Sequence, residues 1–330
     1  MPKPDLAPRR PVPVPQRPHI DLAALVNRAA KALIFAVFGN RAVSAVVRRR
    51  GLTWGASRFV AGETLDAALE VARRLNAAGH PITVQFLGEH VTQREEAEAA
   101  VQVYLQVVEA LARERIDGYI SIKPSQMGLG IAESLCLANL ERVLRAAGEA
   151  GIFVRLEMEE SAFTEATLRI FRTLRPRYPG LGVVLQAYLY RSEDDLLALI
   201  PLQPNIRICK GAYFEPPEVA FPSKADVDRN FVTLVERVLA GGGVVAVATH
   251  DDRIIDHVIR HTQANHIPPD RFEFQMLYGI RPALQQQVRE RGYGMRIYIP
   301  FGAHWYRYFV RRLAERPANI FFLLRNLLRR

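Results

Sequence analysis

The sequence predicts an α/β protein built on a TIM-type (β/α)8 barrel, with a helical arm before it and a helix at its C-terminal end. From about residue 64 onward, short runs of β-branched and aliphatic residues alternate with stretches in which Ala, Leu, Glu and Arg recur at a helical period. Strands that alternate with helices in this way form a parallel sheet. Eight such units in about 250 residues match the size of this barrel. A doubly wound sheet is the alternative, but no Gly-x-Gly-x-x-Gly pattern follows any predicted strand.

The individual elements follow from local composition and periodicity. Each predicted strand is a short run rich in Val, Ile and Phe. We expect strands at 82–87, 118–122, 153–156, 183–187, 206–209, 244–248, 272–276 and 295–299. Each predicted helix has apolar residues three or four positions apart, which gives it one apolar face. We expect helices at 92–115, 133–149, 161–176, 191–200, 225–240, 252–263, 281–291 and 304–315.

The two ends of the chain differ from this alternating region. Residues 1–18 hold seven of the 21 prolines, which predicts a disordered, basic, proline-rich segment. Residues 19–60 are rich in Ala, Leu, Val and Phe, and we expect a helical arm there. An apolar helix face normally packs on protein, but the interspersed basic residues leave an interfacial membrane helix as an alternative. Residues 61–330 make up the predicted barrel with its C-terminal helix.

Three features bear on the compartment in which the protein works. The longest apolar run, 32–38, is far shorter than the ~20 residues of a membrane-spanning helix. The first residues lack the apolar segment of a secretory signal. Two cysteines, Cys136 and Cys209, cannot form a disulfide framework. We therefore expect a cytoplasmic protein, or one attached peripherally to the inner face of the membrane.

The net charge of +10 is concentrated at the two ends of the chain. Residues 1–50 carry +8 and residues 301–330 carry +6, which leaves −4 for the residues between them. Basic ends can contact an anionic membrane surface or can simply be solvated. No nucleic-acid motif or aromatic platform accompanies the charge, so we expect no nucleic-acid partner.

Polar side chains cluster where the predicted strands end, which is where active sites lie in this fold. They are Glu89, His90, Lys123, Glu157, Gln186, Lys210, Thr249, His250 and Asp251, with Gln275 and Tyr298 on the last two strands. This excess of polar groups favours an enzyme. A histidine at a strand end is often structural, so His250 alone decides nothing. No His-x-His pair supports a metal centre, and we expect no metal.

The densest polar cluster follows the last predicted strand. If a helix begins near residue 303, then Tyr308, Arg311, Arg312 and Glu315 share one of its faces. Two neighbouring guanidinium groups can clamp a carboxylate through paired hydrogen bonds, and Glu315 is spaced to hold either arginine. A solvated basic helix face is the alternative.

A second cluster runs from Arg207 to Tyr213. Strand alternation puts Arg207 and Cys209 on one face and Lys210 on the other. Gly211 allows backbone N–H groups to approach a bound anion closely. An unpaired guanidinium inside a barrel strand would be costly, so Arg207 indicates a site rather than a packing position.

These two clusters resemble the proline dehydrogenase family. The resemblance rests on 297–302 with Tyr308, Arg311, Arg312 and Glu315, on 207–213, and on the segments 121–125, 155–159, 248–251 and 272–277, all in the family's order. It covers roughly residues 55–316, which is the whole predicted barrel. The chain is similar to the single-function bacterial form.

The resemblance implies an FAD enzyme that oxidises L-proline to Δ1-pyrroline-5-carboxylate, the first step of proline degradation to glutamate, and passes the electrons to a quinone. It implies that Arg311 and Arg312 bind the proline carboxylate and that Tyr298 packs on the ring. The other implied substrate contacts are Lys123, Tyr213, Leu277 and Glu315. The implied FAD contacts are Met158, Gln186, Arg207, Cys209, Lys210, Gly211, Thr249 and His250. Arg207 and Glu157 are the implied catalytic residues, with Arg207 stabilising negative charge on the reduced flavin.

One position departs from the family pattern. The resemblance predicts aspartate at position 157, paired with Lys123, but this chain has Glu157. Glu157→Ala is therefore expected to weaken turnover and spare the fold. The resemblance also implies that Glu89 closes a lid by pairing with Arg312.

Other functions stay open on sequence alone. A dehydrogenase of hydroxyproline or another cyclic secondary amine would use the same residues. A barrel lyase would use Lys123 or Lys210 as a Schiff-base amine. A barrel-derived binding protein would hold an amino acid or nucleotide without turnover. The sequence also leaves the oligomeric state open.

Overall fold

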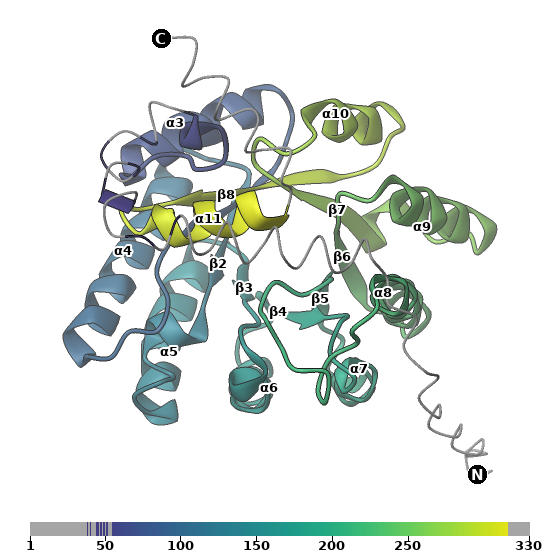
Figure 1. The fold of residues 1–330 in the computed structure, drawn as a ribbon, viewed down its shortest axis with the longest axis horizontal. Coiled ribbons are helices and arrows are strands. Elements are labelled where there is room, and N and C mark those ends of the chain that lie inside the picture. Colours follow the sequence, from purple (N-terminus) through teal and green to yellow (C-terminus); the bar gives the residue numbers. More distant parts are fainter. Residues whose placement is uncertain are drawn as a thin grey trace.

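The computed structural model describes residues 38, 40, 44, 45, 47, 49, 51 and 55–315, with side chains described as far as Arg312. Eight parallel strands form a closed barrel in which each strand pairs with its neighbours in the sequence, and β8 closes the ring against β1. Figure 1 shows the strands at the centre of the molecule. The predicted barrel is therefore confirmed, and the doubly wound sheet is wrong. The predictions for residues 1–18, for most of the 19–60 arm and for residues beyond 315 lie outside the described residues.

The strands agree closely with the sequence prediction. They are β1 Ile82–Phe86, β2 Gly118–Ile122, β3 Val154–Leu156, β4 Leu181–Gln186, β5 Asn205–Cys209, β6 Val244–Ala248, β7 Phe272–Leu277 and β8 Met295–Phe301. The largest differences are in β4, which begins two residues earlier than predicted, and in β8, which runs two residues further. Both extensions keep pairing with a neighbouring strand, Leu181 with Val154 and Phe301 with Phe86.

The helices surround the barrel on the outside, apart from α11, which lies across one end of it (Figure 1). They are α3 Leu65–Ala77, α4 Arg94–Arg113, α5 Glu133–Glu149, α6 Ser161–Leu174, α7 Ser192–Leu199, α8 Lys224–Ala240, α9 Asp252–Ala264, α10 Pro282–Glu290 and α11 Trp305–Glu315. Helix α3 had no predicted bounds, although it lies where the alternation begins. Within the part of the chain that is described, no helix combines the length and the apolar character needed to cross a lipid bilayer.

Strand alternation divides the side chains between two environments. On β3, Val154 and Leu156 belong to the main hydrophobic core, which lies between the strands and the surrounding helices. Arg155, between them in sequence, is also fully buried but hydrogen-bonds to Asn205 of β5, inside the barrel. The barrel interior of this protein therefore contains charged groups.

A second, smaller hydrophobic cluster fixes helix α11 at the end of the barrel where the strands terminate. Trp305 and Phe309 of α11 are buried there with Phe59 and Leu87. The indole N–H of Trp305 donates to Glu63 at 2.7 Å. With α11 fixed in this way, its Tyr308, Arg311 and Arg312 line the cavity at the strand ends.

Candidate active site at the carboxyl ends of the strands

A cavity of about 780 Å³ opens at the carboxyl ends of the strands, a size typical of ligand-binding pockets. It is lined by nearly every site residue predicted from the sequence. These are Lys123, Glu157, Met158, Gln186, Arg207, Cys209, Lys210, Gly211, Tyr213, Thr249, His250, Leu277, Tyr298, Arg311 and Arg312. The side chain of Glu315 lies outside what the structure describes.

Glu157 connects three strands at the floor of this cavity. Its carboxylate forms an ion pair with Arg207 of β5 and accepts a hydrogen bond from Ser121 of β2. The Tyr298 hydroxyl of β8 donates to Glu157 Oε1 at 3.0 Å, and the Arg207 guanidinium lies 5.2 Å from the centre of the Tyr298 ring. The buried guanidinium of Arg207, which would be costly if unpaired, thus has a carboxylate partner.

The electrostatics of this cluster set its protonation state. Burial would raise the pKa of Glu157, but the Arg207 charge beside it holds the pKa below its ordinary value. Burial would lower the pKa of Arg207, and Glu157 raises it instead. Burial and the nearby Glu157 carboxylate raise the pKa of the Tyr298 phenol. At neutral pH the cluster is therefore an ionised pair with a neutral phenol donor.

The predicted pair between Lys123 and Glu157 is wrong in this structure. Lys123 forms its ion pair with Glu89. Both residues follow neighbouring strands, β2 and β1, so their side chains meet at the rim of the barrel. Glu157 reaches into the interior, where Arg207 extends to it from β5.

The predicted partner of Glu89 is also corrected. Glu89 contacts Arg311, with Nη1–Oε1 at 2.7 Å and Nη2–Oε2 at 3.3 Å, and not Arg312. Burial would raise the pKa of Glu89, but the charges of Lys123 and Arg311 lower it to about 2. The guanidinium of Arg312 lies 5.2 Å from the centre of the Tyr308 ring. Adjacent arginines on a helix point in different directions, and only the first reaches the loop after β1.

The residues predicted to contact the cofactor come from the carboxyl ends of β3 to β6 and line the same cavity. Cys209 ends β5, and burial raises the pKa of its thiol to about 11, so the thiol is neutral. Gly211 has a φ of 118° with its Cα against the Tyr188 ring, a position that only glycine fills without strain. His250 accepts a hydrogen bond from the backbone N–H of Leu277 at 3.0 Å through Nε2.

A group of charged residues lies at the mouth of the cavity on this side. Lys210 Nζ is 2.5 Å from Asp228 Oδ1 and 3.2 Å from Asp251 Oδ2. Lys224 Nζ is 3.4 Å from the same oxygen of Asp251. Lys224 and Asp228 were not predicted, because both lie in or at the start of α8, away from any strand end.

Known proteins resemble this chain over nearly its whole length. Residues 68–325 match the family model described as proline dehydrogenase. The proline dehydrogenase of Deinococcus radiodurans is 43% identical over 83% of this chain and 90% of its own length. Proline dehydrogenase 1 of Bacillus subtilis subsp. natto is 40% identical over 88% of this chain and 96% of its own length. This chain belongs to the proline dehydrogenase family.

Proline dehydrogenases are flavin-dependent oxidoreductases that catalyse the first step of proline catabolism, and the relatives named above are single-function forms. A solved structure of proline utilization A from Bdellovibrio bacteriovorus, inactivated by N-propargylglycine, superposes with a TM-score of 0.77 at 24% identity. That match covers 88% of this chain but 36% of the other, so this chain spans about a third of that protein. The likeness supports the barrel fold.

Two glutamines of the barrel strands also line the large cavity. Gln85 of β1 and Gln275 of β7 are buried and line its floor. Gln85 was missed by the sequence analysis, and Gln275 was noted without a role. Within the described part of the chain, no hydrogen-bond partner reaches Gln85 Nε2, Gln275 Oε1 or Arg207 Nη1. Gln85 could have been singled out from the sequence, because it is a long polar side chain in a predicted strand of mostly apolar residues.

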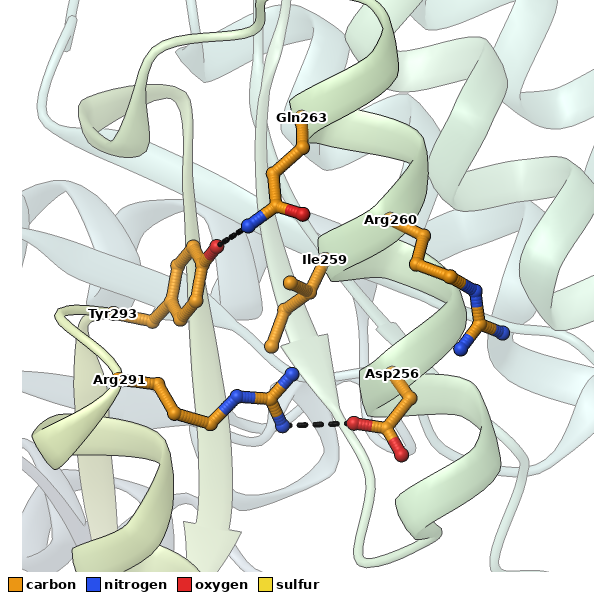
Figure 2. Close-up of a pocket in the computed structure, with 6 residues that line it drawn as sticks. All are labelled: Asp256, Ile259, Arg260, Gln263, Arg291 and Tyr293. Atoms are coloured by element: carbon orange, nitrogen blue, oxygen red, sulfur yellow. Dashed lines mark hydrogen bonds and ion pairs between the residues drawn. The ribbon is translucent and has the colours of Figure 1, made fainter.

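A smaller depression of about 310 Å³ lies between α9 and the loop before β8 (Figure 2). Two polar pairs lie within it: Arg291 forms an ion pair with Asp256 at 2.7 Å, and Gln263 donates to the hydroxyl of Tyr293 at 2.9 Å. Tyr293 precedes the start of β8, so this depression is at the opposite end of that strand from the cavity. The larger cavity is therefore the candidate active site.

Proposed function

We propose that this chain binds FAD and L-proline together in the large cavity and oxidises L-proline to Δ1-pyrroline-5-carboxylate. The observation that carries the proposal is the convergence of an arginine pair, an aromatic phenol and a buried ion pair on one cavity. Proline is a zwitterion with an apolar ring, so its recognition needs a carboxylate clamp and an apolar surface rather than many polar groups. The cavity contains both.

Substrate binding is assigned to the side of the cavity next to α11. Arg311 and Arg312 bind the proline carboxylate, since a guanidinium fork makes paired hydrogen bonds to a carboxylate. Tyr298 packs on the ring, and Lys123, Tyr213 and Leu277 complete the pocket. Glu89 acts as a lid that contacts Arg311. The substrate carboxylate competes with Glu89 for Arg311.

The residues present fit a large polar cofactor. The floor of the cavity presents two donors and an acceptor that have no partner among the described residues, Gln85 Nε2, Arg207 Nη1 and Gln275 Oε1. A polar heterocycle could satisfy such groups, which are costly to leave unpaired. The residues assigned to FAD are Met158, Gln186, Arg207, Cys209, Lys210, Gly211, Thr249 and His250. When bound, FAD supplies the acceptor for the hydride that leaves the proline ring.

The chain contributes positioning and charge to this reaction. The Glu157–Arg207 pair is ionised and fixed by Ser121 and Tyr298, so Arg207 keeps its positive charge beside the cavity. Holding two reactants in contact lowers the entropic part of the barrier. Cys209 carries a neutral thiol and takes no nucleophilic part.

We further propose that a membrane quinone accepts the electrons and that the basic ends bring the enzyme to the membrane surface. The supporting observation is the charge of +8 on residues 1–50 and +6 on residues 301–330. Sedimentation of the full-length protein with vesicles tests this. We expect binding to anionic vesicles that decreases with salt and is weak on zwitterionic vesicles. Equal sedimentation with both would remove the proposal.

Two alternatives are less well supported. Hydroxyproline and related cyclic amines differ from proline by few atoms, and ring packing discriminates such differences by only ~1–3 kcal/mol. A Schiff-base lyase needs an unpaired, neutral amine. Lys123 and Lys210 are both engaged by carboxylates instead. Borohydride in the presence of substrate would trap a lyase covalently and leave a dehydrogenase unlabelled.

The visible absorption spectrum of the purified protein, before and after anaerobic addition of L-proline, tests the proposed function. We expect flavin bands that bleach on addition of proline. Flavin bands that persist would support FAD as the cofactor and would indicate that the substrate is another cyclic or secondary amine. A colourless protein that cannot be reconstituted with FAD would overturn the proposal.

A further inference from the structure

The charges inside the barrel do not balance. Among the described residues, the charged side chains on the strands are Arg155, Arg207, Glu273 and Arg296, and Glu157 reaches into the interior from just after β3. Lys123, just after β2, pairs with Glu89 at the rim of the barrel. Glu157 pairs with Arg207, and Glu273 pairs with Arg296 at 2.9 Å. These two pairs leave Arg155 without a carboxylate partner in the described part of the chain.

No carboxylate of the described residues forms an ion pair with Arg155, although Tyr119 and the more distant Glu273 carboxylate favour its charged form. Its guanidinium donates to the backbone oxygen of Asn205 at 2.7 Å and to the side-chain oxygen Oδ1 of Asn205 at 2.7 Å. It also lies 4.8 Å from the centre of the Phe153 ring and 5.7 Å from that of Tyr119. Arg155 is fully buried, so water does not screen its charge. These contacts supply no full negative charge, and Arg155 Nε has no hydrogen-bond partner in the described part of the chain.

Arg155 is separated from the cavity by a short chain of side chains. The centre of the Tyr119 ring lies 5.7 Å from the guanidinium of Arg155 and 4.1 Å from that of Arg296. The hydroxyl of Tyr119 accepts a hydrogen bond from Gln275, which lines the cavity floor. The positive charge therefore lies below the floor and close to it.

Arg155 interacts electrostatically with Arg207, which lines the cavity. Burial lowers the pKa of Arg155 and repulsion by Arg207 adds to the effect, while Tyr119 and Glu273 oppose it. Arg207 lines the cavity, so the two positive charges act on the same space. A buried charge that lacks a counter-ion lowers the stability of the folded state. Such a charge close to a cleft is a candidate for a functional role.

We propose that Arg155 supplies a fixed positive charge beneath the cavity floor that favours the reduced, electron-rich form of the bound cofactor. The inference rests on the proposed function, because it requires FAD in the cavity. Arg155 does not touch the cavity, so it acts through the electric field that it adds to that of Arg207. Removing or neutralising this charge makes the bound cofactor harder to reduce.

Asn205→Asp tests this inference without removing Arg155. The substitution is nearly isosteric and puts a carboxylate oxygen where the amide oxygen now accepts from Arg155 at 2.7 Å. We expect the midpoint potential of bound FAD to become more negative, with reduced FAD binding at least tenfold more weakly relative to oxidised FAD. For a two-electron couple that ratio corresponds to about 30 mV. Arg155→Gln is expected to shift the potential in the same direction. Arg155→Lys keeps the positive charge and is expected to keep the wild-type potential.

The controls separate this inference from the proposed function. Asn265→Asp makes the same chemical change at an exposed position after α9 and should leave the potential unchanged. If Arg155→Gln does not fold, Asn205→Asp decides alone, since it adds an ion pair and removes no packing. A potential that stays constant in Asn205→Asp, with FAD bound as in the wild type, overturns the role of Arg155. Wild-type protein that binds no FAD instead overturns the proposed function.

Discussion

Glu157 shows how a single residue links folding to function in this barrel. Its carboxylate satisfies Arg207, Ser121 and Tyr298, which come from three different strands. A glutamate reaches one methylene further than the aspartate that the family resemblance predicts here. The structure uses that reach for the interior ion pair, and Lys123 is left to pair with Glu89.

Replacing Glu157 should therefore affect both stability and turnover. On sequence alone, Glu157→Ala was expected to spare the fold. Because removal of one member of a buried ion pair costs ~3–5 kcal/mol, we now expect Glu157→Ala to lower the free energy of unfolding by about that amount. Urea denaturation measures the loss, and steady-state kinetics measure the fall in turnover. Glu157→Asp keeps the charge and serves as the control. Wild-type stability and turnover in Glu157→Ala would show that the pair is dispensable.

The two cavity arginines of α11 should be sensitive to a change that conserves charge. Lysine cannot reproduce the paired hydrogen bonds of a guanidinium. We expect Arg311→Lys and Arg312→Lys each to raise KM for proline roughly 10- to 100-fold, which corresponds to about 1.4–2.8 kcal/mol. Arg307→Lys, on the exposed face of the same helix, is the control and should leave KM unchanged. An unchanged KM in both cavity variants would contradict the assigned clamp.

Glu89 makes stability depend on pH in a defined window. Its pKa is lowered from 4.5 to about 2 in the folded state, so the stabilisation is complete above pH 4.5 and is lost as the pH falls toward 2. At neutral pH the shift corresponds to at most about 3 kcal/mol. Urea denaturation of wild type and Glu89→Gln at several pH values should show a difference that shrinks below pH 4.5. A difference that does not change with pH would contradict the assignment.

A surface ion pair provides the comparison for Glu89. Glu98 pairs with Arg142 at 2.5 Å, and its pKa is also lowered to about 2, first by hydrogen bonds from Arg142. Both side chains are exposed, so salt screens this pair. We expect added salt to remove any effect of Glu98→Gln and to leave most of the effect of Glu89→Gln.

At the scale of elements, the turn between β8 and α11 delivers the arginines to the cavity. Gly302 has a φ of 122°, and its N–H donates to the carbonyl of Gly62 at 2.9 Å. A Cβ at this position would lie 2.9 Å from the Phe86 ring. The turn therefore requires glycine both for its backbone conformation and for its close approach to β1.

Gly302→Ala should destabilise the protein by about 2–3 kcal/mol, since it adds steric conflict to backbone strain. Gly292→Ala is the matched control, because Gly292 also has a positive φ, 85°, but nothing lies within 4 Å of its added Cβ. We expect about 1 kcal/mol for that substitution. Thermal denaturation compares the two. Equal losses would show that the contact with Phe86 relaxes without cost.

The bounds of most elements could be predicted from the sequence because they depend on local periodicity. Helix α5 and strands β2 and β6 begin and end at the predicted residues. The end of β8 could not be predicted, because Pro300 and Phe301 continue the strand through pairing with Gln85 and Phe86 of β1. That pairing joins the last strand to the first and is invisible to any local pattern.

At the scale of the whole molecule, the cavity unites side chains from both ends of the barrel sequence, from Gln85 of β1 to Arg312 of α11. A ligand that contacts so many elements binds the folded state and not the unfolded chain. Binding therefore stabilises the fold by mass action. The size of this stabilisation depends on how tightly the cofactor binds to the folded barrel.

Removal of FAD should lower the melting temperature of the full-length protein. At a free concentration one hundred times Kd, FAD should stabilise the fold by about 2.7 kcal/mol, which corresponds to several degrees. A fluorescence melting curve of the apoprotein with increasing FAD measures the shift. NAD shares the adenine dinucleotide but lacks the flavin, and it should produce no comparable shift. A melting temperature that does not change when FAD is added would contradict the proposed cofactor site.

The sequence by itself determined the barrel, and nearly all of the site residues predicted from it line the cavity. Strand and helix periods are local properties, and in this fold the ends of the strands meet around one cavity. Tertiary structure alone decided which charges are partners. Glu157 pairs with Arg207 and Glu89 with Arg311, because the closed barrel brings β3 and β5 to a common interior and sets α11 beside the loop after β1. Ion pairs depend on distances of a few ångströms between side chains far apart in the chain, and no local pattern contains those distances.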